Sequence, residues 1–127
     1  IETIGEFRDA GRAYGYAEDF QAAALNILEN AIHWLQINPM DDRELSIVAV
    51  RRKRTIEVTI ENNGPPIDPE YIDRLFEPGF SLKTDGTGLG LSIAREACRA
   101  SKGDLHYKDG ANTAFTIVFP TLQENQD

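Results

Sequence analysis

The chain has 127 residues, a formal net charge of −8 and a single cysteine, Cys98. This length suits one domain with a buried core, and the acidic balance argues against a nucleic-acid-binding surface, which needs clustered Lys and Arg. A lone cysteine excludes an internal disulfide and is typical of a reducing compartment, and inside a helical pattern we interpret it as a small buried residue. No apolar run approaches the roughly 20 residues that span a bilayer, and no signal peptide opens the chain, so we expect no membrane contact by this fragment.

Residues 1–17 carry the weakest pattern. We interpret them as a linker or an incomplete leading element, followed by a domain at 18–122 and a polar C-terminal tail at 123–127. The first clear element is a helix, with Asp19 as the expected N-cap and Pro39 as the expected stop. The apolar residues at helical spacing along it are Leu25, Leu28, Ile32 and Leu35.

The segment ELSIVAVRRKRTIEVTIEN, residues 44–62, predicts two strands joined by a basic turn at 51–54, which we interpret as a solvated hairpin tip. Ile56, Val58 and Ile60 alternate with polar residues, the pattern of a sheet with one buried face. The stretch that follows, NNGPPIDPE, is rich in turn-forming residues.

The rest of the chain predicts a short helix at 68–76, a helix from about Thr87 to Ala100, and strands near 104–108 and 113–119. Helices and strands in this order predict an α+β fold, a two-layer sandwich in which helices cover one face of a sheet.

Three glycines at alternate positions, Gly86, Gly88 and Gly90, precede the second long helix. The unpaired amide groups at a helix start lie at the positive end of the helix dipole, and glycines allow phosphate oxygens to approach them. An ordinary loop before a helix is the alternative. The spacing G-x-G-x-G lacks the Gly-Lys-Ser/Thr of the Walker motif and does not match the dinucleotide fingerprint, so the glycines alone leave both interpretations open.

Two asparagines, Asn26 and Asn30, lie four residues apart on the first helix and therefore share a face with Ala23, Ile27 and Leu35. Buried amides cost free energy unless a partner satisfies them. That partner is either a nearby loop or a hard cation such as Mg²⁺, which takes few protein ligands and leaves the rest to phosphates and water.

Four segments together resemble the sequence boxes of the GHKL ATPase superfamily: NILENAIHWL the N box, ENNGPPID the first glycine box, RLFEPGFSLK the F box and GTGLGLSIA the second glycine box. The likeness is greatest to the ATP-binding catalytic domain of bacterial sensor histidine kinases. It implies a Bergerat fold with a mixed, mostly antiparallel sheet, and ATP and Mg²⁺ as cofactors. It also implies a phosphoacceptor-histidine dimerisation domain, in a longer chain or in trans, and a response regulator as partners, and a cytoplasmic location, free or as part of a membrane-anchored receptor.

By this resemblance, Asn30 would coordinate Mg²⁺. Asn26 occupies the position where hydrolysing relatives carry a glutamate base, and because a neutral amide cannot act as a base, phosphoryl transfer is favoured over rapid hydrolysis. His33 either faces phosphate or is an ordinary histidine, and Lys83 either reaches the terminal phosphate from a lid or is merely exposed. The expected phosphate-binding residues are Gly86, Thr87, Gly88, Leu89 and Gly90. The remaining nucleotide-binding candidates are Asn62, Gly64, Ile67, Phe80 and Thr113.

Three positions depart from the family pattern. Asn62 replaces an aspartate that accepts a hydrogen bond from the adenine amino group, Pro66 replaces a glycine, and Gly79 replaces a frequent aromatic residue. An asparagine can rotate its amide, so we expect modest selectivity for ATP over GTP. These departures leave three functions open: the kinase domain, a stand-alone ATPase or nucleotide-gated switch, and a degenerate module for protein interaction. Neither His33 nor His106 resembles a phosphoacceptor, so we expect the substrate histidine elsewhere.

Overall fold

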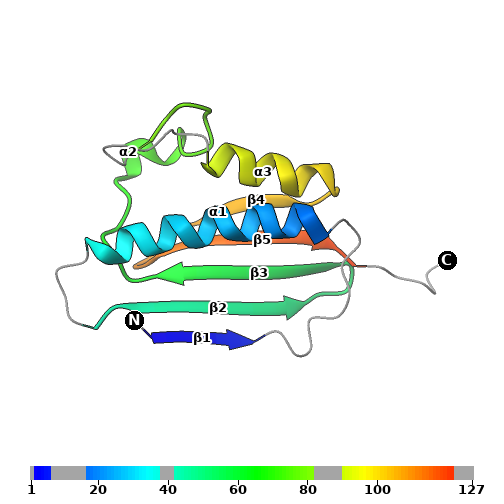
Figure 1. The fold of residues 1–127 in the computed structure, drawn as a ribbon, viewed down its shortest axis with the longest axis horizontal. Coiled ribbons are helices and arrows are strands. Elements are labelled where there is room, and N and C mark those ends of the chain that lie inside the picture. Colours follow the sequence, from blue (N-terminus) through cyan, green and yellow to red (C-terminus); the bar gives the residue numbers. More distant parts are fainter. Residues whose placement is uncertain (1, 7–16, 38–41, 82–89, 122–127) are drawn as a thin grey trace.

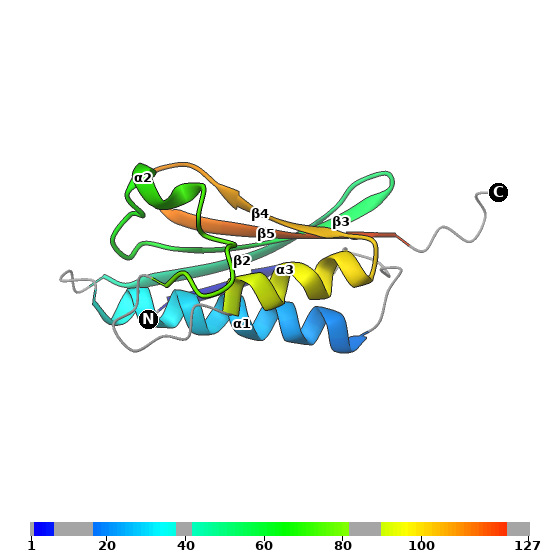
Figure 2. The ribbon, with the colours of Figure 1, turned by 90° about the horizontal axis from the view of Figure 1, so that it is seen from above.

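Two long helices cover one face of a five-stranded sheet (Figures 1 and 2). The computed structural model describes residues 2–6, 17–37, 42–81 and 90–121. The elements in chain order are β1 (Glu2–Glu6), α1 (Ala17–Gln36), β2 (Glu44–Arg51), β3 (Thr55–Asn62), α2 (Pro69–Ile72), α3 (Gly90–Ala100), β4 (Asp104–Lys108) and β5 (Thr113–Pro120). No helix in these described ranges has both the length and the apolar character that crossing a membrane requires.

The sheet has the strand order β1-β2-β3-β5-β4. β1 pairs with β2 in parallel, and the other neighbours are antiparallel, so the predicted mixed, mostly antiparallel α+β sandwich is confirmed. β1 comes from the segment interpreted as a linker or an incomplete leading element, and it is an edge strand of the sheet. The domain limits at 18–122 and the tail at 123–127 stay predictions.

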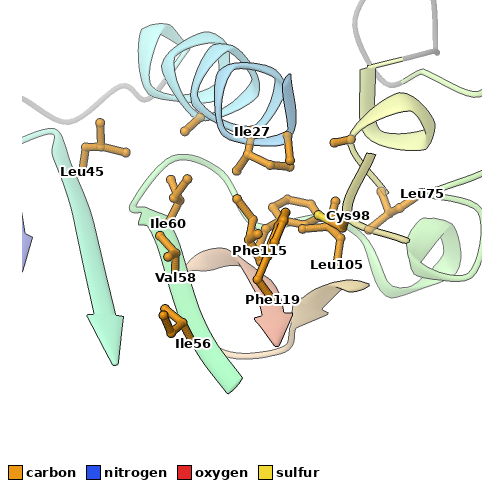
Figure 3. Close-up of a cluster of buried hydrophobic side chains, with 14 of the residues drawn as sticks. Ile27, Leu45, Ile56, Val58, Ile60, Leu75, Cys98, Leu105, Phe115 and Phe119 are labelled. Atoms are coloured by element: carbon orange, nitrogen blue, oxygen red, sulfur yellow. The ribbon is translucent and has the colours of Figure 1, made fainter. Parts of the chain in front are cut away.

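The core lies between α1, α3 and the sheet (Figure 3). On β3 the buried residues Ile56, Val58 and Ile60 alternate with half-buried polar residues, as the sequence predicts. Phe115 on β5 is 2% exposed and meets the ring of Phe76 edge-on, with centroids 6.2 Å apart. The same alternation continues to the end of β3, so the last residue of that strand is also buried on the helix-covered face.

The buried face of α1 differs from the apolar spacing read from the sequence. Leu25 and Ile32 are 59% and 40% exposed, whereas Leu35 is fully buried. The buried side chains of α1 are Ala23, Ile27, Asn30, Ala31 and Leu35. Both sets of residues repeat with a helical period, so periodicity alone did not identify which one faces the sheet.

The start of α1 is fixed to the end of α3, and here the expectation for Asp19 was wrong. The helix begins at Ala17, so Asp19 lies within its first turn instead of capping it. Its Oδ2 accepts a 2.6 Å hydrogen bond from the hydroxyl of Ser101, directly after α3. The expected stop at Pro39 and the expected start of α3 at Thr87 lie outside the described residues.

Asp104, at the start of β4, receives hydrogen bonds from two arginines of α3. The Nε atoms of Arg95 and Arg99 lie 3.1 and 3.0 Å from its Oδ1, and the amide of Leu105 donates to the same oxygen. Burial by itself raises the pKa of Asp104, but the hydrogen bonds from Arg99, the Leu105 amide and Arg95 outweigh it and lower the pKa to about 2. The carboxylate therefore joins the C-terminal half of α3 to the sheet.

Cys98 is fully buried in α3, as the sequence predicts. Burial, followed by the nearby charges of Asp104 and Asp19, raises the pKa of its thiol to about 12. The thiol therefore stays protonated at neutral pH and serves as a small core residue.

Candidate functional site

Two segments contact α1 on the side of the molecule where β3 and α1 both end. This is the opposite end from the basic hairpin tip at 51–54 (Figure 1). The turn after β3 touches the end of α1, because a Cβ atom built on Gly64 would lie only 2.6 Å from the carbonyl oxygen of Trp34. The start of α3 touches the middle of α1, because a Cβ atom built on Gly90 would lie 3.2 Å from Oδ1 of Asn26.

Asn26 and Asn30 lie on the side of α1 that turns toward these contacts. The Nδ2 of Asn26 donates a 2.8 Å hydrogen bond to the carbonyl of Ala22 one turn earlier, which directs its Oδ1 toward Gly90. Asn30 is only 9% exposed, yet its carboxamide makes no hydrogen bond with any residue that the structure describes. Neither amide atom is fully enclosed without a partner, so the carboxamide keeps some accessible surface and is available to a ligand.

Asn62 is buried at the end of β3, 2% exposed, and continues the buried series of that strand. Its Oδ1 accepts a 2.9 Å hydrogen bond from the amide of Gly64. A side chain at position 64 would collide with both the Trp34 carbonyl and this Oδ1, so glycine is required at this close approach. The carboxamide is held in one orientation, whereas the sequence left both orientations open.

Asn63, which the sequence analysis did not single out, fixes the same turn from the other side. Its Nδ2 donates to the carbonyl of Asp42 at 2.7 Å, and its Oδ1 accepts from the amide of Glu44 at 2.9 Å. The only signal for this role was the turn chemistry of the NNG sequence, because the partners lie about twenty residues earlier. The turn is thus joined both to α1 and to the start of β2.

Thr113 lies opposite Asn62 in the β3–β5 pairing and is fully buried. Its hydroxyl donates a long hydrogen bond of 3.5 Å to the carbonyl of Pro65. Ile67, just beyond, is 8% exposed and belongs to the core, whereas Pro66 is exposed. The structure therefore brings Asn62, Gly64 and Thr113 together and places Ile67 in the hydrophobic core.

Phe80 is half-buried after α2. The guanidinium of Arg74 lies 4.4 Å from the centre of its ring, and the ring of Tyr71 lies 5.8 Å away. The preceding Gly79 has a φ of +90°, a conformation that L side chains rarely adopt, so an aromatic residue at that position would be strained. The family departure at Gly79 thus has a local backbone reason.

His33 is half-buried and packs edge-on against the ring of Trp34, with centroids 5.0 Å apart. Lys83 and the phosphate-binding candidates Gly86, Thr87, Gly88 and Leu89 lie outside the described residues. Within the described ranges, no three His, Cys, Asp or Glu side chains come close enough to enclose a metal ion. A cation at this end of the sheet would therefore depend on amide oxygens and on its ligand's own oxygens.

A mixed sheet with helices on one face, and asparagine side chains on α1 and at the end of β3, is the arrangement of the ATPase domains that the four sequence boxes resemble. The family model described as histidine kinase-, DNA gyrase B- and HSP90-like ATPase matches residues 15–123, and the chain belongs to this family.

Its relatives include sensor kinases. The chain is 32% identical over 102 residues to a probable C4-dicarboxylate sensor kinase of Bacillus subtilis, covering 78% of this chain and 19% of that protein. It is 34% identical over 116 residues to the sensory histidine kinase/phosphatase NtrB of Vibrio alginolyticus, covering 84% and 33%. The solved catalytic domain of histidine kinase ThkA superposes with a TM-score of 0.77 at 25% identity, over 94% of this chain and 78% of that one. The chain thus spans a third or less of these two curated relatives.

Proposed function

We propose that this domain binds Mg-ATP at the end of α1 and donates the terminal phosphoryl group to a histidine on a separate helical domain. A response regulator would receive the phosphoryl group afterwards. Such a partner and ATP itself meet in the cytoplasm, so we also propose that the domain works there. The neighbouring domains and the receiving histidine belong to the proposal, because the chain corresponds to only part of its sensor-kinase relatives.

The observation that carries the proposal is the carboxamide of Asn30. Asn30 is 9% exposed, and its carboxamide keeps some accessible surface and has no hydrogen-bond partner among the described residues. A Mg²⁺ ion takes few protein ligands and keeps oxygen ligands from phosphates and water, so one amide oxygen suits it. When bound, the ion would neutralise charge on the phosphates.

The start of α3 supports a phosphate position next to Asn30. Gly90 is the first described residue of α3 and lies against Asn26, so the N-terminal end of the described helix lies near the amide pair of α1. The positive end of a helix dipole attracts phosphate oxygens. The absence of a side chain on Gly90 leaves room for this approach.

The identity of Asn26 favours transfer over hydrolysis. A neutral carboxamide cannot remove a proton from water at neutral pH, and this one is already donating to the carbonyl of Ala22. The domain would then hold ATP until an acceptor arrives. The ordered turn around Asn62 and Gly64 favours a working nucleotide subsite over a degenerate module for protein interaction.

Calorimetric titration of the chain with ATP, with and without Mg²⁺, tests the proposal. We expect Mg²⁺ to strengthen ATP binding in the wild type and in Glu29→Ala, and to have no effect in Asn30→Ala. Glu29 is the matched control, because it neighbours Asn30 in sequence but is exposed to solvent. Equal Mg²⁺ dependence in Asn30→Ala and wild type, with both variants folded, would remove Asn30 from the site.

A further inference from the structure

The orientation of the Asn62 carboxamide is fixed by its contact with the backbone. The amide of Gly64 can only donate a hydrogen bond, so the atom that faces it at 2.9 Å must be Oδ1. Rotating the carboxamide by half a turn would set Nδ2 against this N–H and bring two donors together. Because the residue is 2% exposed, water cannot easily relieve such a contact.

With Oδ1 engaged, the Nδ2 group points away from Gly64 and makes no hydrogen bond with the part of the chain that the structure describes. The neighbouring Asn63 differs, because both of its amide groups are bonded to backbone atoms. Nδ2 is not a fully enclosed atom without a partner, so it keeps some accessible surface and an acceptor on a ligand can reach it. Asn62 therefore offers a donor at the position where the family's aspartate has its second oxygen.

A second polar group lies at this position. Thr113 lies directly across from Asn62, and its hydroxyl hydrogen is directed to the carbonyl of Pro65. A carbonyl can only accept, so the lone pairs of the hydroxyl remain free to accept from a ligand. The pair thus presents a donor from Asn62 beside an acceptor from Thr113.

We infer that this site prefers purine nucleotides with a carbonyl at position 6 over ATP, an inference that rests on the proposed function. Inosine and guanosine triphosphates are such nucleotides. A 6-oxopurine presents an acceptor at O6 and a donor at N1–H, which match Nδ2 of Asn62 and the hydroxyl of Thr113. Adenine presents the reverse, an amino donor and an accepting ring nitrogen. ATP still binds through its phosphates, but with the Nδ2 donor of Asn62 facing another donor.

Competition binding of ITP and ATP in the presence of Mg²⁺ tests this inference, because the two nucleotides differ only in the pairing edge of the base. We expect ITP to bind the wild-type chain about tenfold more tightly than ATP, the effect of one hydrogen bond made instead of one donor left unpaired. We expect GTP, which has the same O6 and N1–H groups as ITP, also to bind more tightly than ATP. Asn62→Asp restores a second accepting oxygen and should reverse the preference to about tenfold in favour of ATP.

The matched control is Asn63→Asp, which adds the same charge one residue along, where the side chain faces backbone atoms of 42–44. It should keep the wild-type preference for ITP. If the wild-type chain binds ATP more tightly than ITP, the inference is overturned and the proposed function stands. This result does not depend on the folding of any variant. Absence of binding by either nucleotide would overturn both. A preference for ITP that persists in folded Asn62→Asp would overturn the role of Asn62.

Discussion

Gly64 determines how closely the first glycine box approaches α1. Its missing side chain allows contact with the carbonyl of Trp34, where a Cβ atom would lie at 2.6 Å, too close for any backbone neighbour. We therefore expect Gly64→Ala to force the turn away from α1, lower the free energy of unfolding by about 2 kcal/mol and weaken ATP binding at least about tenfold. Thermal unfolding and nucleotide titration measure the two effects.

Gly110 is the control for this substitution, because a Cβ atom built there meets no atom within 4 Å. Gly110→Ala should change stability by no more than about 0.5 kcal/mol and leave ATP binding unaltered. If Gly64→Ala behaved like Gly110→Ala, the turn would not depend on its contact with Trp34.

The connection between α3 and β4 depends on the charge of Asp104. Its pKa is lowered from 3.8 to about 2, so its ionised form stabilises the folded state above about pH 4, and this contribution is lost as the pH falls toward 2. Because Arg99 and Asp104 are partly exposed, at 55% and 31%, we expect Asp104→Asn to cost only about 1 kcal/mol at pH 7.

Urea unfolding between pH 2 and 7 measures this contribution. The difference between wild type and Asp104→Asn should be constant above about pH 5 and should shrink as the pH falls toward 2. Asp73→Asn removes an exposed carboxylate with no side-chain bond to the described residues, and its pH profile should follow the wild type. A constant difference between wild type and Asp104→Asn at every pH would contradict the role given to the charge.

At the level of helices and strands, local sequence patterns predicted the features that depend only on residues close together in the sequence. The alternation of Ile56, Val58 and Ile60 identified both β3 and its buried face, and it continues to Asn62. On α1 two apolar stripes share the helical period, and only packing against the sheet selects the one with Ala23 and Ile27. The sequence did not predict β1, because this strand pairs in parallel with β2, a segment about forty residues away.

At the level of the whole molecule, the sequence predicted which residues belong to the site but not how their side chains are arranged. The four boxes identified Asn30 and Asn62, and the structure gives each of them a buried position with an unused amide group. The sequence carries no sign that Gly64 fixes the Asn62 carboxamide, because this depends on the conformation of the turn. Nor does it reveal the bonds of Asn63 to 42–44, which close the turn onto β2.

Amide hydrogen exchange with and without Mg-ATP tests the central claim, that one nucleotide site is formed by α1, the turn after β3 and the start of α3. Bound nucleotide should slow exchange in three segments, residues 26–31, 62–67 and 90–94. The hairpin tip at 51–54, at the other end of the sheet, should be unaffected. Protection at the hairpin tip with none in the three segments, under conditions where calorimetry shows ATP bound, would contradict the account.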